Sequence, residues 1–594
     1  MSGLQSFMER NPAIYYKVNI PSEIEKCRKA TKKTPLILID GSCSRRIFGE
    51  TDPKRILTGG QFKLYKQKAD KFINFLQSFD VELVAFFDGC RIDDMRDKWI
   101  AQRNEDINSA YEILDTIENE GLENVKENMI RRMYNIGMVI KSCFQSKCKV
   151  IQSTLVECDS EIITYAKENK ALAVFSQDAD FAVAQADFAY WSYKDLNYED
   201  QSTYVYDGRK LAQGLGLQVE QLPLLRTMIG NDYVLNNTLH MWFKQLNVHQ
   251  HRNSNFNKHD VISKVALYLK NFDNSVESYK RLATRALGSQ DKFHVIKMSV
   301  DSYMGIKREK VTSLSNDIRW NDLLMQVVNL VQDPHSNLSP MVFDILYKQV
   351  FMTNMLYEDF RKYDIPPSGI LWRPVRAKIY GILLLDFCST NGKKIVKEWV
   401  CHGGDISIPH FVEAVEPSCS LSNYKLQDFW AEDKDEDLIN IAWKLFCNAM
   451  HEDLPVEAVR SINEKIMATT LLVLFMHDEC EMTQDEIDAF LMMSALCSTK
   501  DDVTEYSEAW REQFNTRLLR LSAVFLKGLS TIWLFFNSTC FLIPKESISD
   551  WNIFDGALLQ CLYKSPLSEN SVDDETKQLF QSARNFIDKY SYMF

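Results

Sequence analysis

Seven acidic residues have the types and spacing of ligands for divalent metal ions. They are Asp40, Asp88, Glu157, Asp159, Asp178, Asp180 and Asp232. Hydrolysis of a phosphodiester by two ions needs several carboxylates that converge on ions about 4 Å apart. Mg²⁺ and Mn²⁺ prefer hard oxygen ligands, so Asp and Glu suit such a site better than His or Cys. The seven acids therefore predict a catalytic centre for two Mg²⁺ or Mn²⁺ ions.

Each acid taken singly also fits a structural role. Asp40 and Asp232 fit a strand end or a loop, and Asp88-Gly89 is a common turn pair. The pairs Glu157-x-Asp159 and Asp178-x-Asp180 fit helix caps. A series of acids at strand ends in one domain is harder to assign to turns and caps alone, because like charges at one edge repel unless cations neutralise them.

The segments between the acids alternate short apolar runs with helical patterns. Strands are predicted at residues 35–40, 81–88, 149–152 and 171–176, and helices at 62–79, 93–127 and 159–169. Strands that alternate with helices indicate a largely parallel sheet, in which ligands collect at the carboxyl ends of the strands. Three acids or acid pairs follow such ends.

From about residue 255 onward the pattern becomes helical, with helices predicted at 261–269, 322–331, 341–357, 373–386, 438–450, 456–476, 485–496 and 505–535. The segment Asp364-Ile-Pro-Pro-Ser-Gly369 is a plausible joint, so the predicted domains are 1–250, 251–365 and 366–594, the last two being helical. The apolar stretch Leu519–Ile543 is interrupted by Lys527, Ser530 and Asn537, which favours a buried helix over a membrane span. No membrane association is expected.

The charge is unevenly distributed along the chain. Residues 1–250 hold 32 basic and 34 acidic side chains, and the rest hold 37 and 47, a net of −10. The 14 cysteines form no CxxC pair and indicate buried thiols in a reducing compartment, which predicts an intracellular protein. Acidity argues against broad adhesion to polyanions, although it allows one local basic groove.

In order and spacing the acids resemble the signature of the flap endonuclease/XPG superfamily of PIN-like nucleases. The matching segments are Ile39-Asp40, Phe86-Phe87-Asp88-Gly89, Glu157-x-Asp159, Asp178-x-Asp180 and Ile229-Gly230-Asn231-Asp232-Tyr233. The resemblance implies an α/β PIN-like domain with a mostly parallel sheet, followed by a predominantly α-helical region. It also implies catalytic and metal-binding roles for all seven acids, with Asp159 standing where Glu is more usual.

Finer details resemble one branch, the constitutive coactivator of PPAR-gamma family and its relative asteroid. The segments that carry this resemblance are Gly59-Gly60-Gln61-Phe62, Arg96-Asp97-Lys98-Trp99-Ile100, Gly216-Leu217 through Leu222-Pro223-Leu224-Leu225, and Arg373-Pro-Val-Arg376-Ala-Lys-Ile-Tyr380-Gly381. It implies a nuclear or cytoplasmic protein associated with RNA or with transcriptional coactivation. Two features depart from nucleases that grip duplex DNA: no Gly-rich hairpin follows Asp232, and Ser2 precedes Gly3.

Basic residues that follow the second acid are predicted to bind the substrate strand. They are Arg91, Arg96, Lys98 and Arg103. The neighbours Asp93, Asp94 and Asp97 weaken their field, and a solvated charged helix is the alternative interpretation.

Two functions remain open from the sequence. The first is a divalent-metal-dependent nuclease that acts on RNA or on single-stranded or flapped DNA. The second is a non-catalytic scaffold that binds RNA or protein, with the acidic helical region recruiting protein partners. The complete acid set favours the first, and the missing hairpin and the acidic balance favour the second.

Overall fold

The computed structural model describes most of the chain. The described residues are 3–44, 48, 52–89, 96–130, 136–155, 157–250, 256–306, 313–333, 336, 338–353, 357–387, 393–421, 423–512, 514–567 and 571–593. They divide into two compact units. Unit 1 contains Met1–Phe48, Ala69–Met95 and Cys143–Lys310, and unit 2 contains Gly49–Lys68, Arg96–Ser142 and Val311–Phe594. The predicted domains 1–250, 251–365 and 366–594 stay a prediction.

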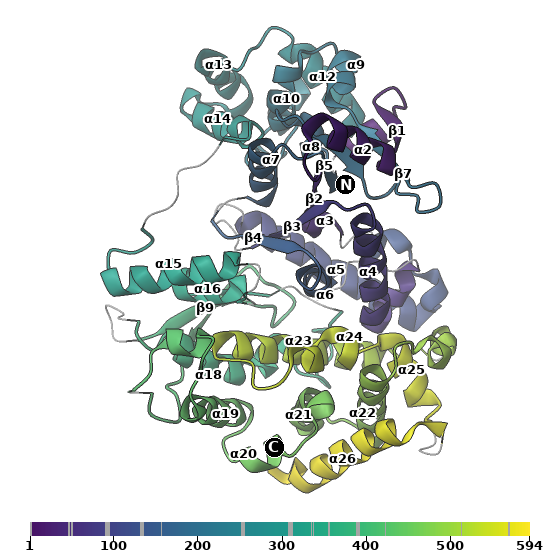
Figure 1. Cartoon of the computed structure of the whole chain (residues 1–594), viewed down its shortest axis with the longest axis vertical. Helices are drawn as coiled ribbons and strands as arrows, with labels where there is room; N and C mark the ends of the chain where they lie inside the picture. The colour runs from purple at the N-terminus through teal and green to yellow at the C-terminus, as the bar shows by residue number, and fades with distance from the viewer. Residues whose placement is uncertain are drawn as a thin grey trace. The chain divides into compact units, whose positions relative to one another are not determined.

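Unit 1 is an α/β domain built on a mixed, mostly parallel sheet of seven strands within its described residues (Figure 1). The strands are β1 (Tyr15–Asn19), β2 (Leu36–Asp40), β3 (Glu82–Asp88), β4 (Lys149–Ser153), β5 (Ala173–Ser176), β6 (Ala189–Ser192) and β7 (Ser202–Tyr206). Their order is β1-β7-β6-β5-β2-β3-β4. Neighbours from β6 to β4 run parallel, whereas β7 is antiparallel to both β1 and β6.

The predicted strands at 35–40, 81–88, 149–152 and 171–176 are confirmed as β2, β3, β4 and β5. All five residues of β2 are buried, as expected for a strand covered on both faces of a parallel sheet. The predicted helices at 62–79, 93–127 and 159–169 correspond to α4 (Phe62–Gln77), α5 (Arg96–Glu120) and α7 (Cys158–Asn169). The strands β1, β6 and β7 were not predicted.

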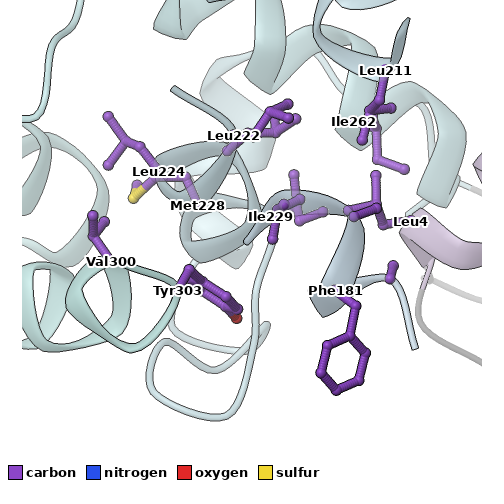
Figure 2. Packing of buried hydrophobic residues seen from close by; sticks show 14 of the residues in the cluster. Leu4, Phe181, Leu211, Leu222, Leu224, Met228, Ile229, Ile262, Val300 and Tyr303 are labelled. Atoms are coloured by element: carbon purple, nitrogen blue, oxygen red, sulfur yellow. The ribbon is translucent and has the colours of Figure 1, made fainter. Parts of the chain in front are cut away.

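Helices cover the sheet of unit 1 and continue beyond it. They include α1 (Gly3–Glu9), α2 (Ile20–Thr31), α3 (Gly41–Ser44), α7, α8 (Asp180–Val183), α9 (Gly208–Leu215), α10 (Leu222–Met228), α11 (His240–Gln245), α12 (Lys258–Leu269), α13 (Val276–Leu287) and α14 (Phe293–Ser302). Every residue of α10 is buried. Figure 2 shows its Leu222, Leu224 and Met228 packed in one cluster with Ile262 and Val300.

Unit 2 is predominantly helical. Its longer helices are α5, α15 (Ile318–Gln332), α16 (Pro340–Lys348), α18 (Arg373–Leu383), α19 (Glu436–Met450), α21 (Glu464–Glu479), α22 (Gln484–Thr499), α23 (Thr516–Ser538), α25 (Gly556–Lys564) and α26 (Asp574–Tyr590). By length and composition α23 could cross a membrane, but 94% of its most apolar window is buried inside the protein. The interpretation of this stretch as a buried helix agrees with that burial.

A small sheet, which the sequence did not predict, lies among these helices. It contains β8 (Val350–Met352), β9 (Ile395–Trp399) and β10 (His410–Glu413), in the order β10-β9-β8. The predicted helix 341–357 is therefore wrong in its second half. Gln349 has a positive φ of 50° and ends α16, and the chain then enters β8.

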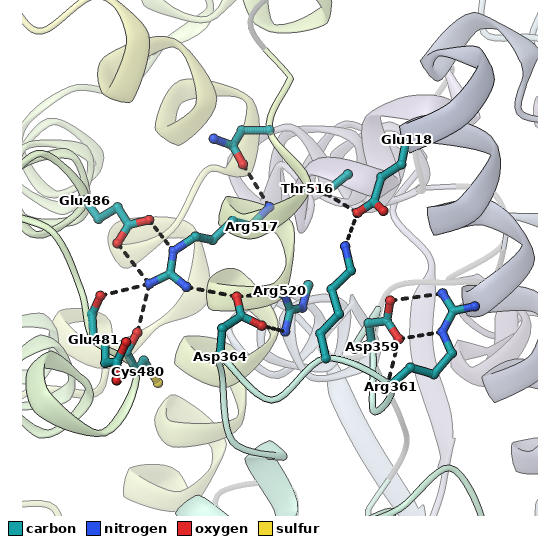
Figure 3. A network of polar contacts seen from close by, with 12 residues as sticks. Glu118, Asp359, Arg361, Asp364, Cys480, Glu481, Glu486, Thr516, Arg517 and Arg520 are labelled. Atoms are coloured by element: carbon teal, nitrogen blue, oxygen red, sulfur yellow. Dashed lines mark hydrogen bonds and ion pairs between the residues drawn. The ribbon is translucent and has the colours of Figure 1, made fainter.

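The segment that begins at Asp364, predicted to be a joint, is held by ion pairs within unit 2. Asp364 accepts hydrogen bonds from Arg520 Nη2 at 2.6 Å and from Arg517 Nη1 at 3.1 Å, and Arg517 also donates to Glu486 (Figure 3). Both arginines belong to α23, most of which is buried. These contacts fix the end of the loop that carries Asp364 to the core of the helical unit.

Candidate functional site

The acids of unit 1 gather at the carboxyl ends of its parallel strands. Asp40 is the last residue of β2 and lies opposite Phe86 of β3, and Asp88 is the last residue of β3. On the other side of β2, Ile39 pairs with Phe175 of β5. Asp178 follows Phe175 by three residues, just beyond the end of β5. This register places the predicted ligands along one edge of the sheet, which we call the acidic edge.

Asp40 lies at the buried centre of the acidic edge. Its carboxylate accepts hydrogen bonds from Ser176 Oγ at 2.6 Å and from the Cys43 backbone N–H at 3.0 Å. Burial raises the pKa of Asp40, and the charge of Asp88 raises it further. The hydrogen bonds from Ser176 and Cys43 oppose this rise. Asp88, in contrast, is exposed, and its backbone N–H donates to Ser42 Oγ.

Asp159 and Asp178 are partly buried and lie within range of the other charges. The pKa of Asp159 is raised well above its ordinary value, first by burial and then by the charges of four acids. These four are Asp40, Asp178, Asp180 and Glu157. Burial, followed by the charge of Asp180, raises the pKa of Asp178 to about 7. The fold therefore brings these carboxylates close enough to repel one another.

Asp180, the first residue of α8, has a cationic partner. Arg226 Nε donates to Asp180 Oδ1 at 2.5 Å, and Tyr303 Oη donates to Asp180 Oδ2 at 3.1 Å. Both side chains are buried with the acid. The charge of Asp180 raises the pKa of Arg226 despite the opposing effect of burial. Both oxygens of this carboxylate are thus engaged within the protein.

Glu157 and Asp232 lie at the periphery of the acidic edge. Glu157 is the N-cap residue of α7 and accepts a hydrogen bond from Tyr233 Oη at 2.8 Å. Asp232 is exposed in the turn that follows Gly230. Gly230 has a φ of +93°, and a Cβ there would lie 2.0 Å from Asn236 Oδ1, so the turn requires glycine. Tyr233 thus ties this turn to the start of α7.

The arrangement fits a two-ion centre only in part. Carboxylates are the correct donors for Mg²⁺ or Mn²⁺, and their mutual repulsion favours the presence of a cation. However, Arg226 and Tyr303 already occupy one acceptor site on each Asp180 oxygen, and the buried guanidinium beside this carboxylate would repel a cation. Across the described ranges, no three His, Cys, Asp or Glu side chains are grouped so that they could hold a metal ion. The two-ion centre therefore does not fit these side chains as they are positioned, and the roles of the seven acids stay a prediction.

Three of the predicted strand-binding residues, Arg96, Lys98 and Arg103, belong to unit 2, whereas the acids belong to unit 1. Arg91 lies outside the described residues, as does the side chain of Lys98. Arg96 lies over the ring of Trp399, with its Cζ 5.8 Å from the ring centroid. Arg103 Nη2 forms an ion pair with Asp106 Oδ2 at 2.9 Å. Arg96 and Arg103 thus have partners in unit 2, and their role in binding a strand stays a prediction.

Sequence reasoning missed the residues that hold the acids in place. Ser176, Tyr233, Arg226 and Tyr303 each bond to a predicted ligand. For Arg226 a signal was present, because a charged residue in the otherwise apolar run from Leu222 to Ile229 needs a buried partner. For the two tyrosines and the serine the sequence offered no such signal.

Comparison with known proteins gives relatives along nearly the whole chain. A family described as "FAM120A-like domain" matches residues 215–307. The constitutive coactivator of peroxisome proliferator-activated receptor gamma from Bos taurus is 22% identical over 94% of this chain and 90% of its own length. The Mus musculus protein of that name is also 22% identical, over 94% of this chain and 88% of its own length.

Solved structures are similar over a smaller part of the chain. The catalytic core of Rad2 in complex with DNA substrate matches 58% of this chain and 97% of that chain, with 14% sequence identity and a TM-score of 0.29. The fold class of unit 1 follows from its own strand order and parallel register.

Proposed function

We propose, from the relationship of this chain to the constitutive coactivators of peroxisome proliferator-activated receptor gamma, that it is a coactivator-type scaffold. In this proposal the nuclease-like α/β unit is a binding module and does not hydrolyse phosphodiesters. A fold of this class supports unrelated functions, so the function depends on the site and not on the fold.

The observation that carries the proposal is the engagement of Asp180 by the protein itself. One of its oxygens accepts from Arg226 and the other from Tyr303. A divalent ion bound to Asp180 would lie beside the buried Arg226 guanidinium, and the two positive charges would repel each other. At this position the carboxylate instead joins α8 to α10 and to the residue after α14, which is a structural role.

The partners proposed for the scaffold are proteins. Residues 251–594 carry a net charge of −10, which favours association with basic surfaces by electrostatic complementarity. The name of the relatives points to a nuclear receptor as one such partner, and a location in the nucleus or cytoplasm belongs to the same proposal.

A second candidate is a metal-dependent nuclease that acts on single-stranded or branched RNA or DNA. It is favoured by the position of Asp40, Asp159 and Asp178, since burial first, and then the charges of neighbouring acids, raise the pKa of each of these carboxyls. A cation bound among them would relieve the repulsion between the acids.

One experiment separates the two candidates. The purified full chain, Asp178→Asn and the matched control Asp187→Asn would be incubated with Mn²⁺ or Mg²⁺ and labelled single-stranded and flapped RNA and DNA. Asp187 is a fully exposed acid in the same unit, so its loss changes the net charge equally. Binding of each protein to the ligand-binding region of the receptor would be measured in parallel.

The scaffold proposal expects no cleavage by any of the three proteins and equal receptor binding by all of them. Cleavage by the wild type and Asp187→Asn, but not by Asp178→Asn, would establish the nuclease. A failure of all three to bind the receptor would count against the scaffold.

A further inference from the structure

We propose that Arg226 is a permanent internal cation that replaces one divalent ion at the acidic edge, so that the edge binds no more than one such ion. The inference rests on the proposed function and deepens it, because it names the residue that prevents a two-ion centre from forming. It concerns binding of the metal alone and can therefore be tested without a substrate.

The position of Arg226 is fixed by the helix that carries it. All seven residues of α10 are buried, and the Arg226 side chain is only 10% exposed. Its Nη1 donates to the Gly230 carbonyl oxygen at 2.5 Å, so the guanidinium is held from two directions, by its own turn and by Asp180. A guanidinium does not lose its proton in a protein, so this positive charge is present at every physiological pH.

A second layer of hydrogen bonds holds Asp180 in place. Tyr303, which donates to Asp180, accepts a hydrogen bond from Asn231 Nδ2 at 3.1 Å. Asn231 Nδ2 also donates to Ser299 Oγ at 2.6 Å, and Ser299 Oγ lies 2.6 Å from Thr227 Oγ1. Figure 2 shows Tyr303 beside this part of α10. The carboxylate therefore cannot rotate toward an ion without breaking a connected buried network, which is costly in a low-dielectric interior.

The charge of Arg226 and its position both oppose the binding of a second divalent ion. The Arg226 charge acts on Asp178 as well as on Asp180, so two acids of the edge share it. A divalent ion bound to Asp180 would lie beside the buried guanidinium, and repulsion between the two positive charges would oppose its binding. Arg226 thus neutralises one carboxylate of the edge, which leaves too little negative charge for a second divalent ion.

The test counts Mn²⁺ ions bound to the full chain by electron paramagnetic resonance and by calorimetric titration. The variants are Arg226→Gln, which removes the charge but keeps a polar side chain, and Arg226→Gln combined with Asp180→Asn. The matched control is Arg281→Gln, an exposed arginine of the same unit. We expect at most one ion on the wild type and on the control, one more on Arg226→Gln, and loss of that additional ion in the double variant.

Two results would overturn the inference. One is a wild type that binds two ions, whatever the variants do. The other is a folded Arg226→Gln protein, as judged by circular dichroism and its melting temperature, that binds no more Mn²⁺ than the wild type.

Should Arg226→Gln fail to fold, Asp180→Asn alone decides the question. An unchanged Mn²⁺ affinity supports the inference, because Asp180 is then no metal ligand, and a tenfold or greater loss overturns it. The cleavage assay described above separates this inference from the proposed function. Two bound ions without cleavage contradict the inference alone, whereas cleavage with one bound ion contradicts the scaffold alone.

Discussion

The ion pair between Arg376 and Glu398 in unit 2 allows a sharp prediction about stability. Glu398 is entirely buried on β9 and Arg376 is 3% exposed on α18. Arg376 donates to both carboxylate oxygens, at 2.7 Å from Nε and 2.9 Å from Nη2, and Tyr380 Oη donates to Oε1 at 2.6 Å. Burial raises the pKa of Glu398, but the charge of Arg376 and these hydrogen bonds outweigh it, and the net pKa is lowered.

Replacement of Arg376 by Met should cost about 3 kcal/mol of unfolding free energy at pH 7, because it leaves most of the buried Glu398 charge uncompensated. Of the ion pairs to this carboxylate within the described residues, only that with Arg373 Nε, at 3.1 Å, would remain. In the wild type the lowered pKa of Glu398 contributes stability that is present above the unfolded value of 4.5 and is lost as the pH falls through the folded pKa. Without Arg376 the effect of burial is offset only by Arg373 and Tyr380, so the pKa of Glu398 rises and the variant regains relative stability as the carboxylate takes up a proton. The difference between the two proteins should therefore shrink from pH 7 to pH 4.

Urea unfolding at several pH values measures this difference, and a double variant with Glu398→Gln provides the control. The neutral amide removes the uncompensated charge, so at least half of the loss should be recovered. A loss below about 1 kcal/mol at pH 7, or a double variant less stable than Arg376→Met, would refute the reasoning, since either result means that the buried charge is not the source of the cost.

Further predictions concern substitutions at single positions. Burial raises the pKa of Asp555 to about 6 from 3.8, so this acid favours folding below pH 3.8, and its contribution is lost as the pH rises to 6, by about 3 kcal/mol. Asp555→Asn should flatten that slope in urea titrations at pH 4, 5 and 7, and an unchanged slope would contradict the assignment. Gly528→Ala should cost about 1–3 kcal/mol, because its Cβ would lie 2.3 Å from Trp372 Cζ2. Gly214→Ala, where a Cβ meets open space within α9, should instead add about 0.5–1 kcal/mol, and thermal unfolding of both variants compares them.

The central part of the fold was predictable because its strands are apolar runs bounded by polar residues. Two of these runs are Leu36–Ile39 and Leu83–Phe87, whose continuous apolar side chains must be buried on both faces of the sheet. The acid that follows each run is the last residue of its strand. The strands β1, β6 and β7 carry tyrosines and polar residues at the antiparallel end of the sheet, and the sequence gives them no comparable continuous pattern.

Helix boundaries in unit 2 were less predictable because apolar spacing continues across breaks in the backbone. The predicted helix 456–476 is interrupted before Glu464, where Asn463 caps α21 through its side chain. The predicted helix 505–535 begins only at Thr516, with Asn515 as its cap. A single residue that can cap a helix is a weak sequence signal when apolar helical spacing continues on both sides of it. Tertiary packing then decides whether the helix ends there.

The acidic edge shows why ligand positions can be predicted from sequence while their chemical state cannot. The order of the acids along the chain is enough to place Asp40, Asp88 and Asp178 at neighbouring strand ends, because parallel strands all end at one edge. Whether an acid is available to a metal depends on partners far away in sequence: Arg226 reaches Asp180 across 46 residues and Tyr303 across 123. Where an arginine takes the place of an ion, the acids stabilise the fold and do not bind metal. The acids have the same order and spacing in the sequence in either case, so the sequence motif does not distinguish the two.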